Sequence, residues 1–165
     1  MAETPPRLCE RLSEEGRRTV EFFTSLEPAG WESQVYAEGG RWSARQVLAH
    51  FVSAEIGFRQ IITDIINGGE GAPEGLDIDR FNESQVAQMA AMSCDDLLAQ
   101  FEQNRGLTVE LVGRMETGDL EKVGRHPFLG RARLDEIIKL LYRHNQIHQR
   151  DIRRALAAGA GKPQI

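Results

Sequence analysis

The chain has 165 residues, of which 41% are hydrophobic and 27% charged, and its formal net charge is −5 at pH 7. These values are typical of one soluble domain with its own apolar core, so we expect a single domain over residues 1–165. The negative charge argues against nonspecific nucleic-acid binding, which needs a basic face, and no run of 18 apolar residues is present that would span a membrane.

Helical periodicity runs through the sequence, and no segment shows the alternation of apolar and polar residues that predicts a strand. The first helix is expected at about residues 6–26, where Gly16 weakens it by roughly 1 kcal/mol relative to Ala, and residues 31–41 form a long connection. Ser43 and Gln46 have the spacing of a capping box, which marks the start of the second helix. The Gly-rich run at residues 67–75 ends that helix.

A short helix is expected at about residues 78–92, and Ser93 is placed to cap the third long helix. Residues 124–131 are expected to form a loop, the last helix to cover about residues 132–157, and residues 158–165 to be a flexible tail. Four long amphipathic helices predict an all-α four-helix bundle with a short extra helix between the second and third long helices. The long first connection allows a crossover, so up-down-up-down order is not implied.

The two cysteines and the N-terminal sequence both favour a cytoplasmic protein. Cys9 and Cys94 form no CxxC motif, so the sequence predicts reduced thiols rather than a redox pair or a zinc knuckle. The N-terminal stretch MAETPPRLCERLSEEG lacks the apolar region of a signal peptide.

Three histidines are expected to point into the core. His144 and His148 lie about 40° apart on the last helix, and Asp151 lies about 20° to the other side of His144. His50 lies at the centre of the apolar stripe of the second helix. One buried imidazole is easily paired with a neighbouring polar group, whereas three together favour a shared partner. A divalent metal is such a partner, and three protein ligands leave one coordination position open, as in catalytic sites.

Other interpretations of these residues stay open. An HxxxH pair alone is weak, because such pairs are common on helix surfaces. Asp151 can orient a ligand ring, serve as a fourth ligand, or pair with Arg154. Glu55 lies about 140° from His50 on the helix and is expected to be solvated rather than a ligand. His126, in the predicted loop, is not expected to join the histidine group, and Arg150 can either contact a substrate anion or suit the helix C-terminus.

Three stretches of the sequence are characteristic when taken together: RWSARQVLAHFVSAE, DIDRFNESQV and RHPFLGRARLDEIIKLLYRHNQIHQRDI. With them, the sequence resembles the DinB-like (YfiT-like) superfamily of metalloenzymes from the first helix to about residue 156. Its marks are the Trp-Ser start of the second helix, the histidine seven residues after Ser43, and HxxxH on the last helix. The resemblance implies a four-helix bundle, commonly a homodimer, with a divalent metal bound by His50, His144 and His148.

The resemblance also implies a chemistry. Nickel or zinc is the expected metal, and iron and manganese also occur in the family. Some members are thiol-dependent transferases or isomerases that use bacillithiol or mycothiol, and others are labelled metal-dependent hydrolases. We therefore expect a metal-dependent enzyme that acts on a small-molecule substrate, with thiol-dependent S-transfer or isomerisation ahead of hydrolysis. A non-catalytic, metal-binding, stress-associated dimer is a third alternative.

No catalytic base stands out, and Asp151 and Tyr142 are the candidate catalytic residues because they lie beside the histidines in the sequence. Asp151 departs from the family pattern, in which Gln often stands three residues after the last histidine. Three aromatic side chains can line the mouth of the site or pack over the bundle ends: Trp31, Trp42 and Phe128.

Overall fold

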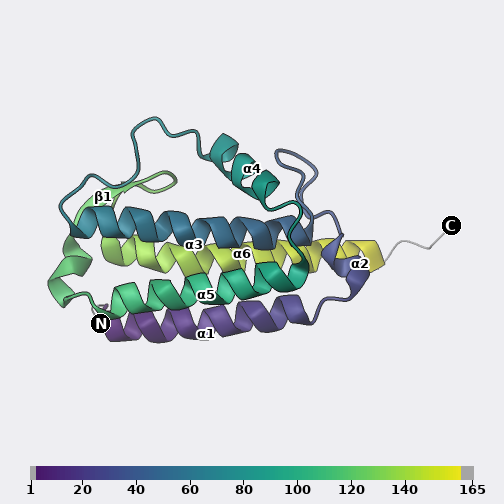
Figure 1. The fold of residues 1–165 in the computed structure, drawn as a ribbon, viewed down its shortest axis with the longest axis horizontal. Coiled ribbons are helices and arrows are strands. Elements are labelled where there is room, and N and C mark those ends of the chain that lie inside the picture. The colour runs from purple at the N-terminus through teal and green to yellow at the C-terminus, as the bar shows by residue number, and fades with distance from the viewer. Residues whose placement is uncertain (1–2, 161–165) are drawn as a thin grey trace.

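A computed structural model describes residues 3–160, and most of them are helical (Figure 1). The four long helices are α1 (Pro5–Thr24), α3 (Ala44–Ile66), α5 (Cys94–Gly113) and α6 (Leu134–Ala160). The shorter helices are α2 (Pro28–Trp31), α4 (Ile78–Gln88) and the 3-10 helix η1 (Thr117–Glu121). The prediction of a four-helix bundle with a short extra helix between its second and third long helices is confirmed.

The bundle does not have up-down-up-down order. Helix α1 packs against α5 and α6, and α3 packs against the same two helices, so α1 and α3 lie on a diagonal. Helices α1 and α6 run in one direction and α3 and α5 in the other (Figure 1). The connection between α1 and α3, which includes α2, therefore crosses the end of the bundle. As a result, α3 and α6 are antiparallel neighbours.

The predicted capping residues begin their helices as expected. The Ser43 hydroxyl accepts a hydrogen bond from the backbone N–H of Gln46 at 3.3 Å, and the Gln46 side chain accepts one from the Ser43 N–H at 2.9 Å. This capping box fixes the first turn of α3. The Ser93 hydroxyl accepts from the N–H of Asp96 at 3.0 Å and starts α5 in the same way.

The prediction that no strand occurs is wrong. Strands β1 (Val123–His126) and β2 (Gly130–Arg133) form an antiparallel hairpin where a loop was expected, and α6 begins only at Leu134. Each strand has four residues, too few to show a clear alternation. The His126 Nδ1 atom accepts hydrogen bonds from two backbone N–H groups of the turn, at 3.1 and 3.3 Å. Gly130 has a φ of 69°, which glycine adopts at little cost.

The end of α6 also differs from the expected helix boundary. Residues 158–160 are helical rather than part of a tail, and residues 161–165 lie outside the described residues.

Within residues 3–160, no helix is both long and apolar enough to cross a membrane.

The core consists of two apolar clusters with a polar layer between them. One cluster lies toward the hairpin end of the bundle and includes Leu12 and Ile62, and the other lies toward α2 and includes Phe23 and Phe51. The polar layer comprises four buried side chains: Glu55, Arg105, Thr108 and Asn145. Buried polar groups must be paired to be tolerated, and these side chains pair with one another.

Glu55 is the centre of the polar layer, so the expectation that it is solvated is wrong. Its side chain is fully buried, and its Oε1 accepts from Arg105 Nε at 2.9 Å and from Arg105 Nη2 at 2.6 Å. Its Oε2 accepts from the Thr108 hydroxyl at 2.8 Å. In the orientation that satisfies both its neighbours, the Asn145 carboxamide accepts from Arg105 Nη2 at 2.9 Å. The face of α3 opposite the histidine is therefore buried as well, against α5.

Gly16 has a packing role at the level of this layer. A Cβ atom at Gly16 would lie 2.8 Å from the Cγ atom of Arg105. The residue that weakens α1 by propensity therefore makes room for the aliphatic part of the buried arginine.

Candidate metal centre

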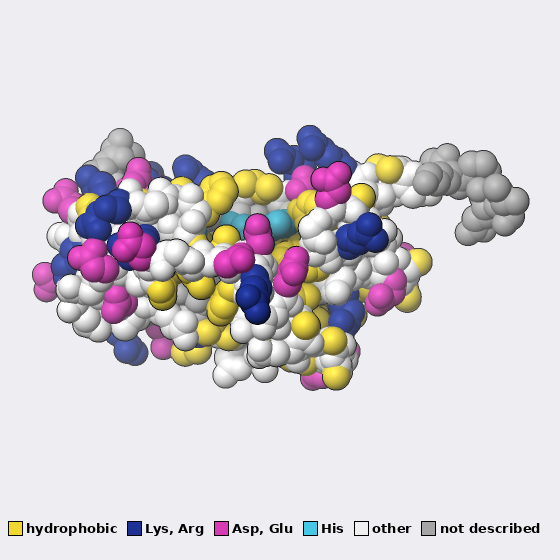
Figure 2. Space-filling model, turned by 90° about the horizontal axis from the view of Figure 1, so that it is seen from above, with side chains coloured by type: hydrophobic (Ala, Val, Ile, Leu, Met, Phe, Trp, Pro, Cys, Tyr) yellow, Lys and Arg dark blue, Asp and Glu magenta, His cyan; other side chains and the backbone are white. Residues whose placement is uncertain are grey.

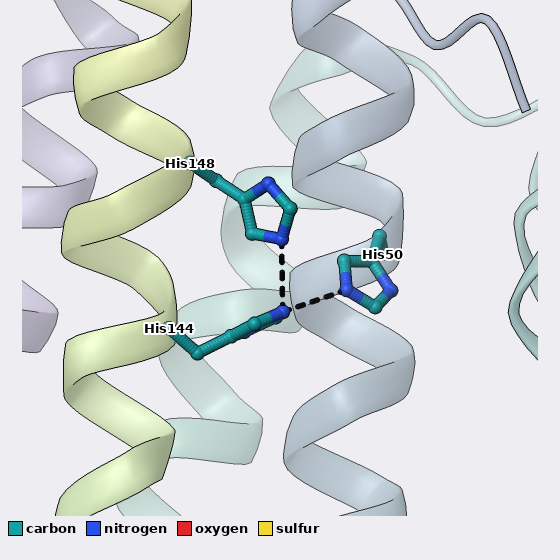
Figure 3. A group of neighbouring side chains, drawn as sticks. All are labelled: His50, His144 and His148. Carbon is teal, nitrogen blue, oxygen red and sulfur yellow. Dashed lines mark hydrogen bonds between the residues drawn. The ribbon is translucent and has the colours of Figure 1, made fainter. Parts of the chain in front are cut away.

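The three predicted histidines converge between α3 and α6 (Figure 3). The Nε2 atom of His144 lies 2.9 Å from Nε2 of His50 and 2.9 Å from Nε2 of His148. The rings of each pair are inclined to one another by 77–88°. The three ring nitrogens therefore meet from three directions, all within 4.8 Å of one another.

The fold explains this convergence. His144 and His148 are four residues apart, about one helical turn, and therefore lie on the same face of α6. Antiparallel packing of α3 on α6 brings His50 to the same level as these two histidines. The Phe51 ring packs against the pair, with centroids 5.7 and 5.8 Å from those of His144 and His148. The Trp42 ring lies 4.9 Å from that of His50. Aromatic side chains therefore limit the movement of each imidazole.

The site opens onto one face of the molecule. Figure 2 shows histidine side chains at the bottom of a recess, with apolar side chains around them and acidic side chains, next to a basic one, on one part of the rim. His50 is only 6% exposed, and His144 and His148 are half-buried. The histidines are therefore shielded from bulk water but reachable from this face.

Burial keeps the three imidazoles neutral at pH 7. Burial, with a smaller contribution from the charge on His148, lowers the pKa of His50 to about 3. Burial also lowers the pKa of His148 to about 4, although the carboxylate of Asp151 acts in the opposite direction. The pKa of His144 is well below its usual value, first through burial and then through the charges of the other two rings. Neutral imidazoles are the form that binds metals.

The geometry suits a shared cation. A neutral imidazole nitrogen has either one N–H or one lone pair in the ring plane, so Nε2 of His144 cannot be well paired with two other Nε2 atoms. A cation can accept a lone pair from all three. Tetrahedral zinc with Zn–N bonds of about 2.0–2.1 Å places its nitrogen ligands about 3.3 Å apart, and two of the distances between these atoms, both 2.9 Å, lie within about half an ångström of that value. Among residues 3–160, no fourth His, Cys, Asp or Glu joins the group, so it can hold an ion with one coordination position left over.

A residue that the sequence did not indicate lies directly behind His148. The Tyr36 hydroxyl is 2.5 Å from His148 Nδ1 and donates to Asp151 Oδ2 at 2.8 Å. Burial and the hydrogen bond to Asp151 raise the pKa of Tyr36 above its usual value, so the phenol keeps its proton. Tyr36 is 112 residues away from His148 in the sequence, and nothing in its local sequence marks it.

Asp151 lies on the Nδ1 side of His148, away from the point where the three Nε2 atoms meet. Its position agrees with the alternative in which it orients a ligand ring, here through Tyr36, rather than with a fourth ligand. The basic side chain beside it is Arg150, whose Nε lies 3.8 Å from Asp151 Oδ1, and not Arg154.

Tyr142, the other candidate catalytic residue, is buried in the apolar cluster toward the hairpin. It lies about 200° around α6 from His144, and no hydrogen bond between Tyr142 and a histidine is found in the described part of the chain. His126 is not part of the histidine group, as predicted.

Of the three aromatic side chains considered for the mouth of the histidine site, only Trp42 lies beside one of the site's histidines. Trp42 contacts His50, as described above. Trp31 packs against Phe23 at the bundle end, with centroids 5.4 Å apart, and Phe128 is 79% exposed in the hairpin turn.

Together, the fold and the site define a class: four-helix bundles with a three-histidine group suited to a divalent cation. The chain belongs to the DinB superfamily, which matches residues 11–152. This finding confirms the resemblance that the sequence motifs indicated.

A solved structure has the same fold. It is YfiT from Bacillus subtilis, described as a probable metal-dependent hydrolase with an unusual four-helix bundle topology. The two structures superpose with a TM-score of 0.69 at 14% sequence identity, and the match covers 96% of this chain and 89% of the YfiT chain. No curated protein matches this sequence.

Proposed function

We propose that the protein is a divalent-metal-dependent enzyme in which His50, His144 and His148 bind the ion through Nε2. The observation that carries the proposal is the convergence of three neutral imidazoles at the bottom of an open recess. When bound, a divalent ion supplies Lewis acidity, which lowers the pKa of a water or thiol and makes a nucleophile available at neutral pH. The aromatic side chains of Trp42 and Phe51 orient the rings and exclude water from behind them.

The donor set favours zinc or nickel. Imidazole nitrogen is a good ligand for zinc, nickel, copper and iron, whereas manganese and magnesium prefer oxygen ligands. All three donors of this group are imidazoles. In the Irving–Williams order iron(II) binds such a site more weakly than nickel or zinc, and manganese is the least favoured of the metals that the family resemblance implies.

Hydrolysis is the reaction that the surroundings support best. Acidic side chains on the rim of the recess (Figure 2) disfavour an anionic ligand through like-charge repulsion, which the basic side chain beside them offsets in part, whereas water carries no charge. The similarity to YfiT, described as a probable metal-dependent hydrolase, supports the same reaction.

Thiol-dependent transfer is the second candidate. It needs a place for a low-molecular-weight thiol, and Arg150 beside Asp151 can receive an anionic group of such a ligand. Because the Asp151 carboxylate offsets part of the Arg150 charge, this feature supports transfer only weakly.

The two reactions can be separated with zinc-loaded protein. We expect hydrolysis of a neutral nitrophenyl ester that does not depend on added thiol, is lost in His148→Ala and is kept in His126→Gln, a buried histidine outside the group. Turnover of an aryl halide only with added thiol would instead support transfer. Turnover that survives in His148→Ala would contradict a metal-dependent reaction. If neither substrate reacts, the enzymatic proposal gives way to the non-catalytic metal-binding alternative.

We also propose that the chain forms a homodimer, on the family resemblance alone. Light scattering should then give twice the 18.5 kDa mass of one chain. A mass of one chain at micromolar concentration would contradict the dimer and leave the metal proposal unaffected.

A further inference from the structure

Two side chains of α6, His148 and Asp151, and one from the connection before α3, Tyr36, form a short hydrogen-bonded series behind one of the three histidines. Asp151 Oδ2 accepts from the Tyr36 hydroxyl at 2.8 Å, and the same hydroxyl oxygen lies 2.5 Å from Nδ1 of His148. The series continues across the imidazole ring to Nε2 of His148, which faces the other two histidines.

The direction of these hydrogen bonds follows from the chemistry of the groups. A phenol has one proton to donate, and a carboxylate can only accept. The Tyr36 proton therefore points to Asp151, and the phenol oxygen faces His148 as an acceptor. Nδ1 of His148 must then carry the N–H, and because the ring is neutral, Nε2 keeps its lone pair.

The other two histidines lack this arrangement. Nδ1 of His50 and Nδ1 of His144 are buried without a hydrogen-bond partner among the described residues. Nothing in the described structure therefore selects a tautomer for them through Nδ1. His148 is the ligand whose orientation and tautomer are set by a second group.

The backbone around Tyr36 is fixed. The N–H groups of Val35 and Tyr36 both donate to the Trp42 carbonyl, at 2.9 and 3.4 Å, and Gln34 pairs with Ser43 at the start of α3. The connection that crosses the bundle end therefore presents the Tyr36 phenol to His148 and the Trp42 ring to His50.

We propose that Tyr36 and Asp151 are positioning residues that fix His148 as the Nδ1–H tautomer, with Nε2 free for a cation, and that they thereby set the metal affinity of the site. This inference rests on the proposed function, because it concerns the same three histidines. Groups that orient a ligating histidine typically change metal affinity by about 10–100-fold when they are removed. The negative charge of Asp151 also makes the imidazole a better donor, through the phenol.

Zinc affinity, measured by competition with a chromophoric chelator, tests the proposal. We expect Tyr36→Phe to bind Zn²⁺ about 10–100-fold more weakly than the wild type. The zinc affinity of Asp151→Asn should lie between those of the wild type and Tyr36→Phe. The double variant should bind no more weakly than Tyr36→Phe, because Asp151 acts through the phenol. The matched control is Tyr142→Phe, which removes a buried phenol elsewhere and should leave the affinity unchanged.

The tautomer provides a readout that a merely structural role would not change. Long-range ¹H–¹⁵N correlation spectra of zinc-free protein should show His148 as the Nδ1–H form in the wild type and as a mixture in Tyr36→Phe. If Tyr36→Phe does not fold, Asp151→Asn replaces it in the affinity test, because it keeps the phenol. A twofold or smaller affinity change with an unaltered tautomer would overturn the proposal.

The failure of this inference can be distinguished from the failure of the proposed function. A wild-type protein that binds no zinc, or a His148→Ala variant that binds it equally well, would overturn the metal site itself. Tight wild-type binding that is lost in His148→Ala but unchanged in Tyr36→Phe would overturn only the role of Tyr36 and Asp151.

Discussion

At the scale of single residues, the buried pair of Glu55 and Arg105 is the most consequential feature outside the histidine group. Both side chains are at least 95% buried, and their hydrogen bonds join α3 and α5 to α1 through the Leu12 carbonyl and to α6 through Asn145. Such a pair adds little stability compared with an apolar replacement, but breaking it leaves a charge buried without its partner. Asn145, which pairs with Arg105, directly follows His144 in the chain, so the buried pair also borders the histidine group.

Replacing Glu55 by Gln should therefore destabilise the fold strongly. We expect a decrease in the free energy of unfolding of about 3–5 kcal/mol, since Arg105 would lose its counter-charge. Urea denaturation measures this change. The control is Glu110→Gln, which alters a pair whose side chains are 81% and 64% exposed and should have little effect. Similar losses in both variants would contradict the role given to the buried pair.

At the scale of elements, the hairpin is joined to the loop after α3. The backbone N–H of Ala72 donates to the Arg125 carbonyl at 2.8 Å, and the Arg125 N–H donates to the Glu70 carbonyl at 2.7 Å. Gly71 lies between these bonds with a φ of 87°, and a Cβ atom there would lie 2.5 Å from the Arg125 carbonyl oxygen. Glycine is therefore required at this junction for two reasons, conformation and space.

Comparison of Gly71→Ala with Gly75→Ala separates these two reasons. Gly75 also has a positive φ, of 72°, but a Cβ atom there would have no neighbour within 4 Å. We expect Gly75→Ala to lower the free energy of unfolding by about 1–2 kcal/mol through conformation alone, and Gly71→Ala to lower it further. Thermal or urea unfolding measures both. Equal losses would show that the contact with Arg125 does not constrain the hairpin.

The sequence predicts the long helices well because each has an amphipathic stripe, and because Ser43 and Ser93 mark the starts of α3 and α5. The sequence does not predict the hairpin because four-residue strands are too short to show an alternation of apolar and polar residues. Part of the hairpin's stabilisation also comes from backbone hydrogen bonds to the loop before α4, which no local pattern indicates. The sequence does not predict the burial of Glu55, because the apolar stripe of α3 marks the opposite face and the partner Arg105 is 50 residues away.

The candidate site shows the same division between local and tertiary information. Helical spacing and an apolar stripe were sufficient to bring His50, His144 and His148 together. The role of Tyr36 depends on the path of a connection that crosses the bundle end, and no local pattern encodes that path.

At the scale of the whole molecule, the buried histidines make stability depend on pH. Burial lowers the pKa of His50 to about 3 and those of His126 and His148 to about 4, whereas an unfolded histidine titrates near 6.5. Between pH 6.5 and 4 the unfolded chain therefore binds more protons than the folded one. The free energy of unfolding must fall as the pH falls through this range, and it is fully retained above it.

Metal-free protein should show this dependence in urea denaturation at pH 7, 6 and 5. Each histidine contributes up to about 1.4 kcal/mol per pH unit, so the loss should be steep below pH 6.5. The His126→Gln variant should show a shallower dependence, because one of these groups is removed. A stability that does not change between pH 7 and 5 would contradict neutral, buried histidines.

The central claim is that the three histidines bind one divalent ion, and the metal content of protein purified without chelator or affinity tag tests it most directly. Elemental analysis should find about one zinc or nickel ion per chain in the wild type, the number that one three-histidine site can hold. The His148→Ala variant, folded but lacking one of three ligands, should lose it. Full metal occupancy in that variant, or a wild-type protein that takes up no divalent metal, would contradict the claim.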